Sequence, residues 1–256
     1  MEHEFGFLIT DLDGTAIDTR EDAMPSQRLI DAVSAAQKYI SISVATGRPI
    51  GNSRDIIRAL GIKSPCILSG GSQIIDPQTE KTLWEKRLNE SQVSDVVEKC
   101  KPYDFVLLFG DELLSDPNAV PAKEKVVTGP ERIIFLMGVN DGELGPILAA
   151  IATVNDIVAH VAPSWSKGKK DIHVTHIGAT KGQALKVLFE MLNVQKETAV
   201  AVGDSSNDLP LFRGVGYKVA MGNATEELKE EADYITASVE EDGLAQFIEQ
   251  RILSQT

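Results

Sequence analysis

Four aspartates in two pairs are the residues of this chain best suited to chemistry. Asp11 and Asp13 follow an apolar run near the N-terminus, and Asp204 and Asp208 follow another such run. Carboxylates gathered in one place raise each other's pKa and repel unless a cation neutralises them. Mg²⁺ suits such a set because it prefers hard oxygen ligands and leaves room for water and phosphate oxygens. The pattern therefore indicates a magnesium site that handles a phosphate group.

Two further residues could hold the phosphate oxygens that the metal leaves free. The hydroxyl of Thr46 offers a hydrogen-bond donor and Lys181 offers a positive charge. Taken alone, a threonine is often only a helix cap and a lysine only a solvated residue. Asp208 taken alone could be an acid that stabilises the first turn of a helix. Their functional interpretation rests on their combination with the other aspartates.

The elements that must position these residues form a crossover pattern. Short β-branched apolar runs alternate with segments of helical period, which predicts a parallel sheet with crossover helices. Asp11, Thr46 and Asp204 each follow one of the predicted strands, and ligands of open α/β sheets bind at such carboxyl ends. The predicted strands of this pattern are residues 5–10, 40–45, 66–68, 198–202, 218–221 and 234–236, with a hairpin after residue 68.

The middle of the chain has a different pattern. Predicted helices at 91–101 and 143–154 are interspersed with predicted strands at 105–109, 133–139, 157–162 and 171–175. This arrangement is typical of a self-contained α+β unit. We therefore expect an α/β protein in two domains, a Rossmann-like core of residues 1–82 and 179–256 and an inserted domain of residues 83–178.

Four short motifs occur in order along the chain: Asp11-Leu12-Asp13-Gly14-Thr15, Thr46-Gly47-Arg48, Lys181-Gly182 and Gly203-Asp204-Ser205-Ser206-Asn207-Asp208. Together they resemble the motifs of the haloacid dehalogenase (HAD) superfamily. The insertion falls between the second and third motifs, which is similar to HAD subfamily IIB with its C2B-type cap and its Cof-like sugar phosphatases. One departure is Ser69-Gly70-Gly71-Ser72, where Cof-like proteins tend to carry Asn-Gly-Ala.

The resemblance implies a magnesium-dependent phosphatase of small phosphorylated metabolites, in particular sugar phosphates. It implies that Asp11 attacks phosphorus and that Asp13 is the general acid and base. Asp11, the backbone carbonyl of Asp13, and Asp204 would hold Mg²⁺, while Asp208 completes the acidic pocket and orients Lys181. The residues implied to bind substrate or phosphate are Leu12, Thr46, Gly47, Arg48, Lys181 and Asn207. Arg48 and Asn207 could equally be surface residues.

Other interpretations stay open. A phosphomutase of similar cap class would share the first motif, but it needs arginines that bind a second phosphate, and the predicted cap has only Arg87 and Arg132. A metabolite-binding regulator with vestigial activity is a third possibility. A calcium loop of the EF-hand type is disfavoured because its sixth position requires glycine and here is Ala16.

A histidine-containing strand in the predicted cap also attracts attention. Asp171, His173 and Thr175 would share one face of a strand, with His176 just beyond, a spacing that could hold a metal. We expect a role in the core of the cap or at the junction of the domains instead.

Composition limits the partners. The formal charge of −13 disfavours nucleic acid and anionic membranes, so we expect a small-molecule substrate. Cys66 and Cys100 have no pairing or metal-ligand spacing, which predicts reduced thiols. The first residues lack a basic start followed by a long apolar run, so we expect a cytoplasmic protein.

Overall fold

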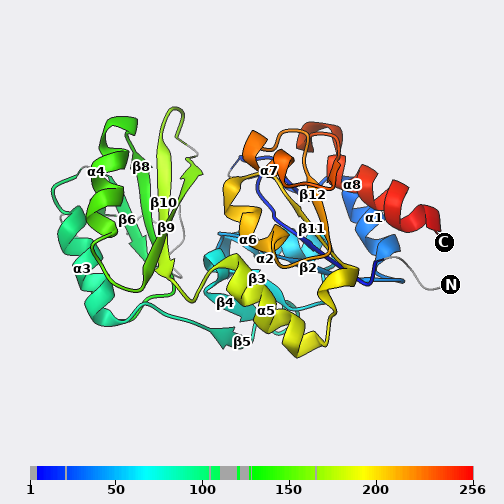
Figure 1. Ribbon diagram of the computed structural model, residues 1–256, viewed down its shortest axis with the longest axis horizontal. Helices are drawn as coiled ribbons and strands as arrows, with labels where there is room; N and C mark the ends of the chain where they lie inside the picture. The colour runs from blue at the N-terminus through cyan, green and yellow to red at the C-terminus, as the bar shows by residue number, and fades with distance from the viewer. Residues whose placement is uncertain are drawn as a thin grey trace.

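A parallel sheet forms one side of the molecule (Figure 1). The computed structural model describes residues 5–20, 22–103, 105–109, 120–121, 127, 129–164 and 166–255. Every residue of its two central strands is buried, as expected for a sheet that is covered on both faces. In spatial order its strands are β13 (Tyr234–Ile235), β12 (Tyr217–Ala220), β11 (Ala199–Gly203), β1 (Phe7–Thr10) and β2 (Ser41–Val44).

Most helices of this sheet lie in the connections between strands, and α8 follows the last strand. α1 contacts α8, and α5 contacts α6. Ser26 and Thr180 begin α1 and α5, because each side chain accepts a hydrogen bond from a backbone N–H of the first turn. The helices are α1 (Gln27–Ala36), α2 (Ile50–Ala59), α5 (Lys181–Leu192), α6 (Leu209–Phe212), α7 (Glu226–Glu230) and α8 (Gly243–Phe247).

A small antiparallel sheet extends from the edge of the parallel sheet. It consists of β3 (Cys66–Leu68), β4 (Gln73–Ile75) and β5 (Thr82–Glu85), and a bridge between Ala45 and Ile67 joins it to β2. The hairpin predicted after residue 68 is confirmed by the β3–β4 pairing. The predicted domain boundary at residues 82 and 83 falls inside β5.

An antiparallel sheet forms the other side of the molecule (Figure 1). Two helices, α3 (Glu90–Cys100) and α4 (Asp141–Ile151), pack against one of its faces, where Ile172 and Val174 join their buried side chains. In spatial order its strands are β7 (Val120–Pro121), β6 (Val106–Phe109), β8 (Ile134–Val139), β10 (Lys170–His176) and β9 (Ile157–Pro163).

Buried apolar side chains form separate clusters on the two sides. We call the parallel sheet with β3–β5 and its helices the parallel lobe, and β6–β10 with α3 and α4 the antiparallel lobe. The predicted fold class, an α/β protein with a parallel sheet and an additional α+β part, is confirmed. Among the described residues, no helix is both long and apolar enough to cross a membrane.

Candidate active site

Asp11 and Asp204 lie close together because the strands that precede them are neighbours in the sheet. β1 pairs with β11 on one side and with β2 on the other, so the chain reverses its order of winding at this point. Such a switch point opens a crevice at the carboxyl ends of the strands. Asp11 follows β1 and Asp204 follows β11, with Thr10 beside Val202 in the register. The sheet therefore places both carboxylates at one edge.

The acidic cluster contains three of the four predicted aspartates. Carboxylate oxygens of Asp11, Asp204 and Asp208 all lie within 4.8 Å of one another. Lys181, the first residue of α5, reaches into this group. Its Nζ lies 2.9 Å from Asp11 Oδ2 and 2.7 Å from Asp208 Oδ1, and its side chain is only 4% exposed.

The electrostatics of the cluster follow from burial. Loss of water raises the pKa of Asp11 well above its ordinary value, with Lys181 opposing this and Asp208 and Asp204 adding to it. Burial and then the charge of Asp208 raise the pKa of Asp204 to about 7. Burial alone would lower the pKa of Lys181, but Asp11 and Asp208 outweigh it and raise that pKa. The single positive charge of Lys181 therefore does not balance the repulsion among the three carboxylates of Asp11, Asp204 and Asp208.

Asp208 is committed to positioning its neighbours. Its Oδ2 accepts the backbone N–H groups of Asp204 (3.1 Å) and Ser205 (3.3 Å), and its Oδ1 accepts from Lys181. Its side chain is fully buried. Asp208 therefore closes the capping box of the helical turn Ser206–Asp208 and also pairs with Lys181 inside the buried cluster.

The carboxylate oxygens of Asp11 and Asp204 suit a divalent cation. Asp204 and Asp11 supply hard carboxylate donors, and a cation between them would relieve the repulsion that raises their pKa values. Thr15 Oγ1 donates to Asp204 Oδ1 at 3.1 Å and fixes that side chain. Gly14 has φ +74°, and a Cβ there would lie 2.4 Å from Asp204 Oδ2, so only glycine lets the loop pass this carboxylate.

Asp13 stands apart from the cluster and pairs with Arg48. Nε of Arg48 donates to Asp13 Oδ2 at 2.9 Å, and its Nη2 reaches Asp13 Oδ1. The Arg48 side chain is 5% exposed, and its Nη1 also donates to the backbone carbonyl of Asn52. Arg48 is thus a buried residue of the site, which decides against its interpretation as a surface arginine.

The structure places the other predicted residues around this centre. The backbone N–H of Leu12 donates to Asp11 Oδ1 at 2.7 Å, while the Leu12 side chain is buried in the apolar core. Thr46 is fully buried, and its Oγ1 accepts from the backbone N–H of Arg48 at 3.1 Å. Asn207 Oδ1 accepts from Ser205 Oγ at 2.9 Å and lies 3.5 Å from Lys181 Nζ.

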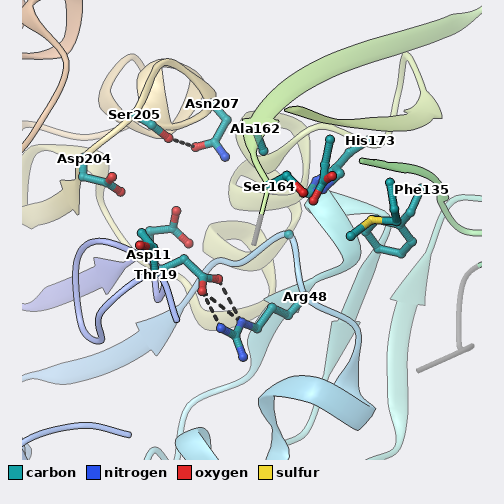
Figure 2. Close-up of a pocket in the computed structure, with 14 residues that line it drawn as sticks. Asp11, Thr19, Arg48, Phe135, Ala162, Ser164, His173, Asp204, Ser205 and Asn207 are labelled. Carbon is teal, nitrogen blue, oxygen red and sulfur yellow. Dashed lines mark hydrogen bonds and ion pairs between the residues drawn. The ribbon is translucent and has the colours of Figure 1, made fainter. Parts of the chain in front are cut away.

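A cavity of about 130 Å³ connects this centre to the antiparallel lobe. Figure 2 shows Phe135, Ala162, Ser164 and His173 on one side and Asp11, Asp204 and Arg48 across from them. The residues that line it are Asp11, Asp13, Thr19, Gly47, Arg48, Phe135, Met137, Ala162, Ser164, Asp171, His173, Asp204, Ser205 and Asn207.

Sequence reasoning missed several of these residues. Phe135 and Met137 could have been found, because two residues at alternate positions of one strand share a face. Nothing in the local sequence marks Ser164 for its position, whereas Thr15 belongs to the first of the four motifs. His173 lies beside the second motif, because a Cβ on Gly47 would lie 3.3 Å from His173 Nδ1.

The comparisons with known proteins agree with this geometry. The model of the haloacid dehalogenase-like hydrolases matches residues 8–127 and 134–248. The chain belongs to this family. It is 29% identical to phosphoglycolate phosphatase 1 of Saccharolobus solfataricus over 94% of the chain and 93% of that protein. It is 27% identical to the 5-amino-6-(5-phospho-D-ribitylamino)uracil phosphatase YcsE of Bacillus subtilis, over 96% and 95%.

Solved structures share the fold. The crystal structure of a haloacid dehalogenase-like hydrolase from Bacteroides thetaiotaomicron matches with a TM-score of 0.77 and 24% identity, over 96% of this chain and 99% of that one. A HAD subclass IIB sugar phosphatase matches with a TM-score of 0.72 and 21% identity, over 95% and 98%. The predicted superfamily and the predicted class of enzyme, a HAD-type phosphatase, are confirmed.

Proposed function

We propose that this HAD-family chain is a magnesium-dependent phosphatase of small phosphorylated metabolites, in particular sugar phosphates, which works through an aspartyl phosphate at Asp11. The observation that carries the proposal is the buried contact of Asp11 with Lys181 inside the cluster with Asp204 and Asp208. A fixed lysine beside a buried carboxylate can hold a phosphate group in position for attack by that carboxylate.

In the first half of the reaction, a carboxylate oxygen of Asp11 forms a bond to phosphorus. The bond between phosphorus and the oxygen of the leaving group breaks at the same time. Asp13, in its acid form, gives its proton to that oxygen, so the product leaves as an alcohol. In the structure Arg48 contacts both carboxylate oxygens of Asp13, so one of these oxygens has to leave Arg48 to carry the proton to the leaving group.

In the second half, Asp13 acts as the base. Its carboxylate takes a proton from a water molecule as the water oxygen attacks phosphorus, and the bond from phosphorus to Asp11 breaks. Inorganic phosphate leaves, Asp11 is again a carboxylate and Asp13 again carries a proton. Lys181, Asn207 and the Thr46 hydroxyl, with the backbone of Leu12, Gly47 and Arg48, are proposed to bind the phosphate oxygens.

Asp11, Asp204 and the backbone carbonyl of Asp13 would hold Mg²⁺, with Asp208 completing the acidic pocket. When bound, the ion supplies positive charge to the phosphate oxygens and neutralises the carboxylates. We also propose that residues 1–82 and 179–256 act as the catalytic core and residues 83–178 as a cap that encloses the leaving group. The lining of the cavity by Phe135, Ser164 and His173 supports that division.

A phosphomutase is not favoured. The two arginines of the predicted cap, Arg87 and Arg132, both pair with Glu85, and neither lines the cavity. Among the described cavity-lining residues of the antiparallel lobe, none is a lysine or an arginine that could bind a second phosphate.

The test is phosphate release from a panel of sugar phosphates, nucleotides and phosphoglycolate, with Mg²⁺ or with EDTA. We expect release that requires Mg²⁺ and that Asp11→Asn abolishes, while Asp18→Asn, in the same loop but paired with Arg20 at the surface, keeps it. Release that is indifferent to Asp11, or no release from any ester, would contradict the proposal.

A further inference from the structure

One wall of the cavity is a face of the antiparallel sheet. Side chains alternate between the two faces of a strand, and Ile172 and Val174 of β10 pack against α3 and α4. Asp171 and His173 therefore lie on the opposite face, and both line the cavity. Phe135 and Met137 of β8 line it as well, and the ring of Phe135 contacts His173 edge to face with centroids 4.9 Å apart.

A β-bulge fixes the position of Asp171 on this wall. The register of β10 with β8 shifts between Lys170 and Ile172, so that one extra residue of β8 faces Asp171. Gly138 takes φ +76° at this point, and its N–H donates to Asp171 Oδ1 at 2.8 Å. Bulges redirect side chains and are common beside active sites. Asp171 is 4% exposed and is held in place rather than free in solvent.

Asp171 gives this wall a negative charge, and none of the described cavity-lining residues of the antiparallel lobe is a lysine or an arginine. The one lysine or arginine among the described residues that line the cavity is Arg48, which is already paired with Asp13. Burial and the neighbouring His160 lower the pKa of His173 to about 4, so its ring is neutral at physiological pH. Burial raises the pKa of Asp171, while hydrogen bonds from Gly138 and Ser164 oppose that shift.

We propose that Asp171 is a specificity-determining residue, which selects phosphate esters whose leaving group is uncharged and hydroxylated and which rejects leaving groups that carry a second anion. The inference rests on the proposed function, which puts the phosphate at Asp11 and Lys181 and the leaving group toward this wall. A hydroxyl of the leaving group can donate a hydrogen bond to the Asp171 carboxylate. A carboxylate or second phosphate there would face a like charge, and no lysine or arginine among the described cavity-lining residues of the antiparallel lobe would balance it.

The test compares esters that differ in one group of the leaving group, a hydroxymethyl or a carboxylate. One pair is glycerol 3-phosphate and 3-phosphoglycerate, and the other is 2-hydroxyethyl phosphate and 2-phosphoglycolate. We measure kcat/KM for each with the full chain and Mg²⁺. For the wild type we expect the uncharged member of each pair to be better by about tenfold or more, from the Coulomb energy of a like-charge pair at partial burial.

The decisive variant is Asp171→Asn, which keeps an oxygen that can accept from Gly138 but removes the charge. We expect the preference to fall by about tenfold, through faster turnover of the carboxylate esters. The matched control is Asp95→Asn, the same change at an exposed position of α3 outside the cavity, and it should leave the preference unchanged. If Asp171→Asn does not fold, Asp171→Ser takes its place.

Three results would overturn the inference. The wild type could prefer the carboxylate esters, the preference could survive Asp171→Asn and Asp171→Ser, or these variants could lose both members of a pair equally. Each of these results is seen with Asp11-dependent release still present, so it leaves the proposed function standing. Failure of the proposed function would instead appear as the absence of Asp11-dependent release from every ester.

Discussion

In the parallel lobe the polar side chains of the cavity follow the ends of strands, whereas in the antiparallel lobe they stand on the face of a sheet. Asp11 and Asp204 come directly after β1 and β11. Asp171 and His173 lie within β10. The parallel strands are buried on both faces, so their ends are the positions left for polar groups. The antiparallel sheet is covered by helices on one face and is free to present side chains from the other.

The two arrangements differ in rigidity and in charge. The strand-end groups are buried, charged and tied to each other, as in the contacts of Lys181 with Asp11 and Asp208. On the antiparallel wall the lining is mainly apolar or neutral, with Asp171 as its acid. In the proposed enzyme, bond breaking therefore belongs to the parallel lobe and the choice of the leaving group to the antiparallel lobe.

The largest effect is expected from Lys181→Met, which tests whether the parallel-lobe charges depend on each other. It leaves Asp11 and Asp208 buried without their cation, so we expect the free energy of unfolding to fall by about 3–5 kcal/mol, together with loss of activity. Urea unfolding measures this loss. Lys186→Met is the matched control, because Lys186 lies in the same helix but is exposed. Equal stability of the two variants would contradict the picture of a buried, coupled cluster.

Asp13→Asn tests the assignment of bond breaking to the parallel lobe. We expect kcat to fall by about 10²- to 10⁴-fold, the usual contribution of a general acid and base. Because a good leaving group needs little protonation, the loss should be smaller for p-nitrophenyl phosphate than for an alkyl phosphate. Steady-state and single-turnover kinetics check both statements. A change confined to KM would place Asp13 in substrate binding instead.

His173→Gln probes the neutrality of the antiparallel wall. Burial lowers the pKa of His173 to about 4, below the value of about 6.5 in an unfolded chain. The unfolded state therefore binds more protons between these values, and the native state loses stability as the pH falls through this window. Integrated over the whole window, the loss amounts to roughly 3 kcal/mol.

The measurement is the free energy of unfolding of wild type and His173→Gln between pH 7 and pH 4.5. The raised pKa values of Asp11 and Asp204 act with the opposite sign, because the native state then binds more protons. These contributions of Asp11 and Asp204 are the same in wild type and variant, so they cancel when the two free energies of unfolding are subtracted. We expect the wild type to lose more stability than the variant on acidification, and parallel profiles would show that His173 is not buried as a neutral ring.

The smallest effect is expected from Mg²⁺, which we propose binds in the parallel lobe. Mg²⁺ at ten times its dissociation constant should stabilise the native protein by about 1.4 kcal/mol, seen as a raised melting temperature. Asp204→Asn should remove this shift, whereas Asp171→Asn, which changes a buried carboxylate of the other lobe, should keep it. A shift that disappears with Asp171 instead would mean that the ion binds on the antiparallel wall.

Much of the parallel lobe could be predicted from local sequence. The strands before Asp11 and Asp204 are short apolar runs that are followed by a polar residue, and their observed ends differ from the predicted ones by at most two residues. The helix that begins at Lys181 was marked by Thr180 as its cap. Local patterns suffice here because burial on both faces forces a continuous apolar run.

The antiparallel wall was harder to predict because the positions of its side chains depend on the register between paired strands. The common face of Asp171 and His173 follows from alternation along one strand, and this was predicted. The β8–β10 bulge that sets Asp171 against Gly138 depends on pairing between strands far apart in the sequence. Ser164 reaches the cavity through the β9–β10 connection, and no local pattern marks it.

The sequence by itself determined the family, the α/β class and the set of residues that the proposed chemistry requires, because these depend on residue type and on order along the chain. Tertiary structure alone decided how they are paired. Arg48 became a buried partner of Asp13 instead of a surface residue, and Asp171 became the acceptor of the Gly138 N–H at a β-bulge. The physical reason is that ion pairing and desolvation depend on distances between side chains, which only the packing of distant segments sets.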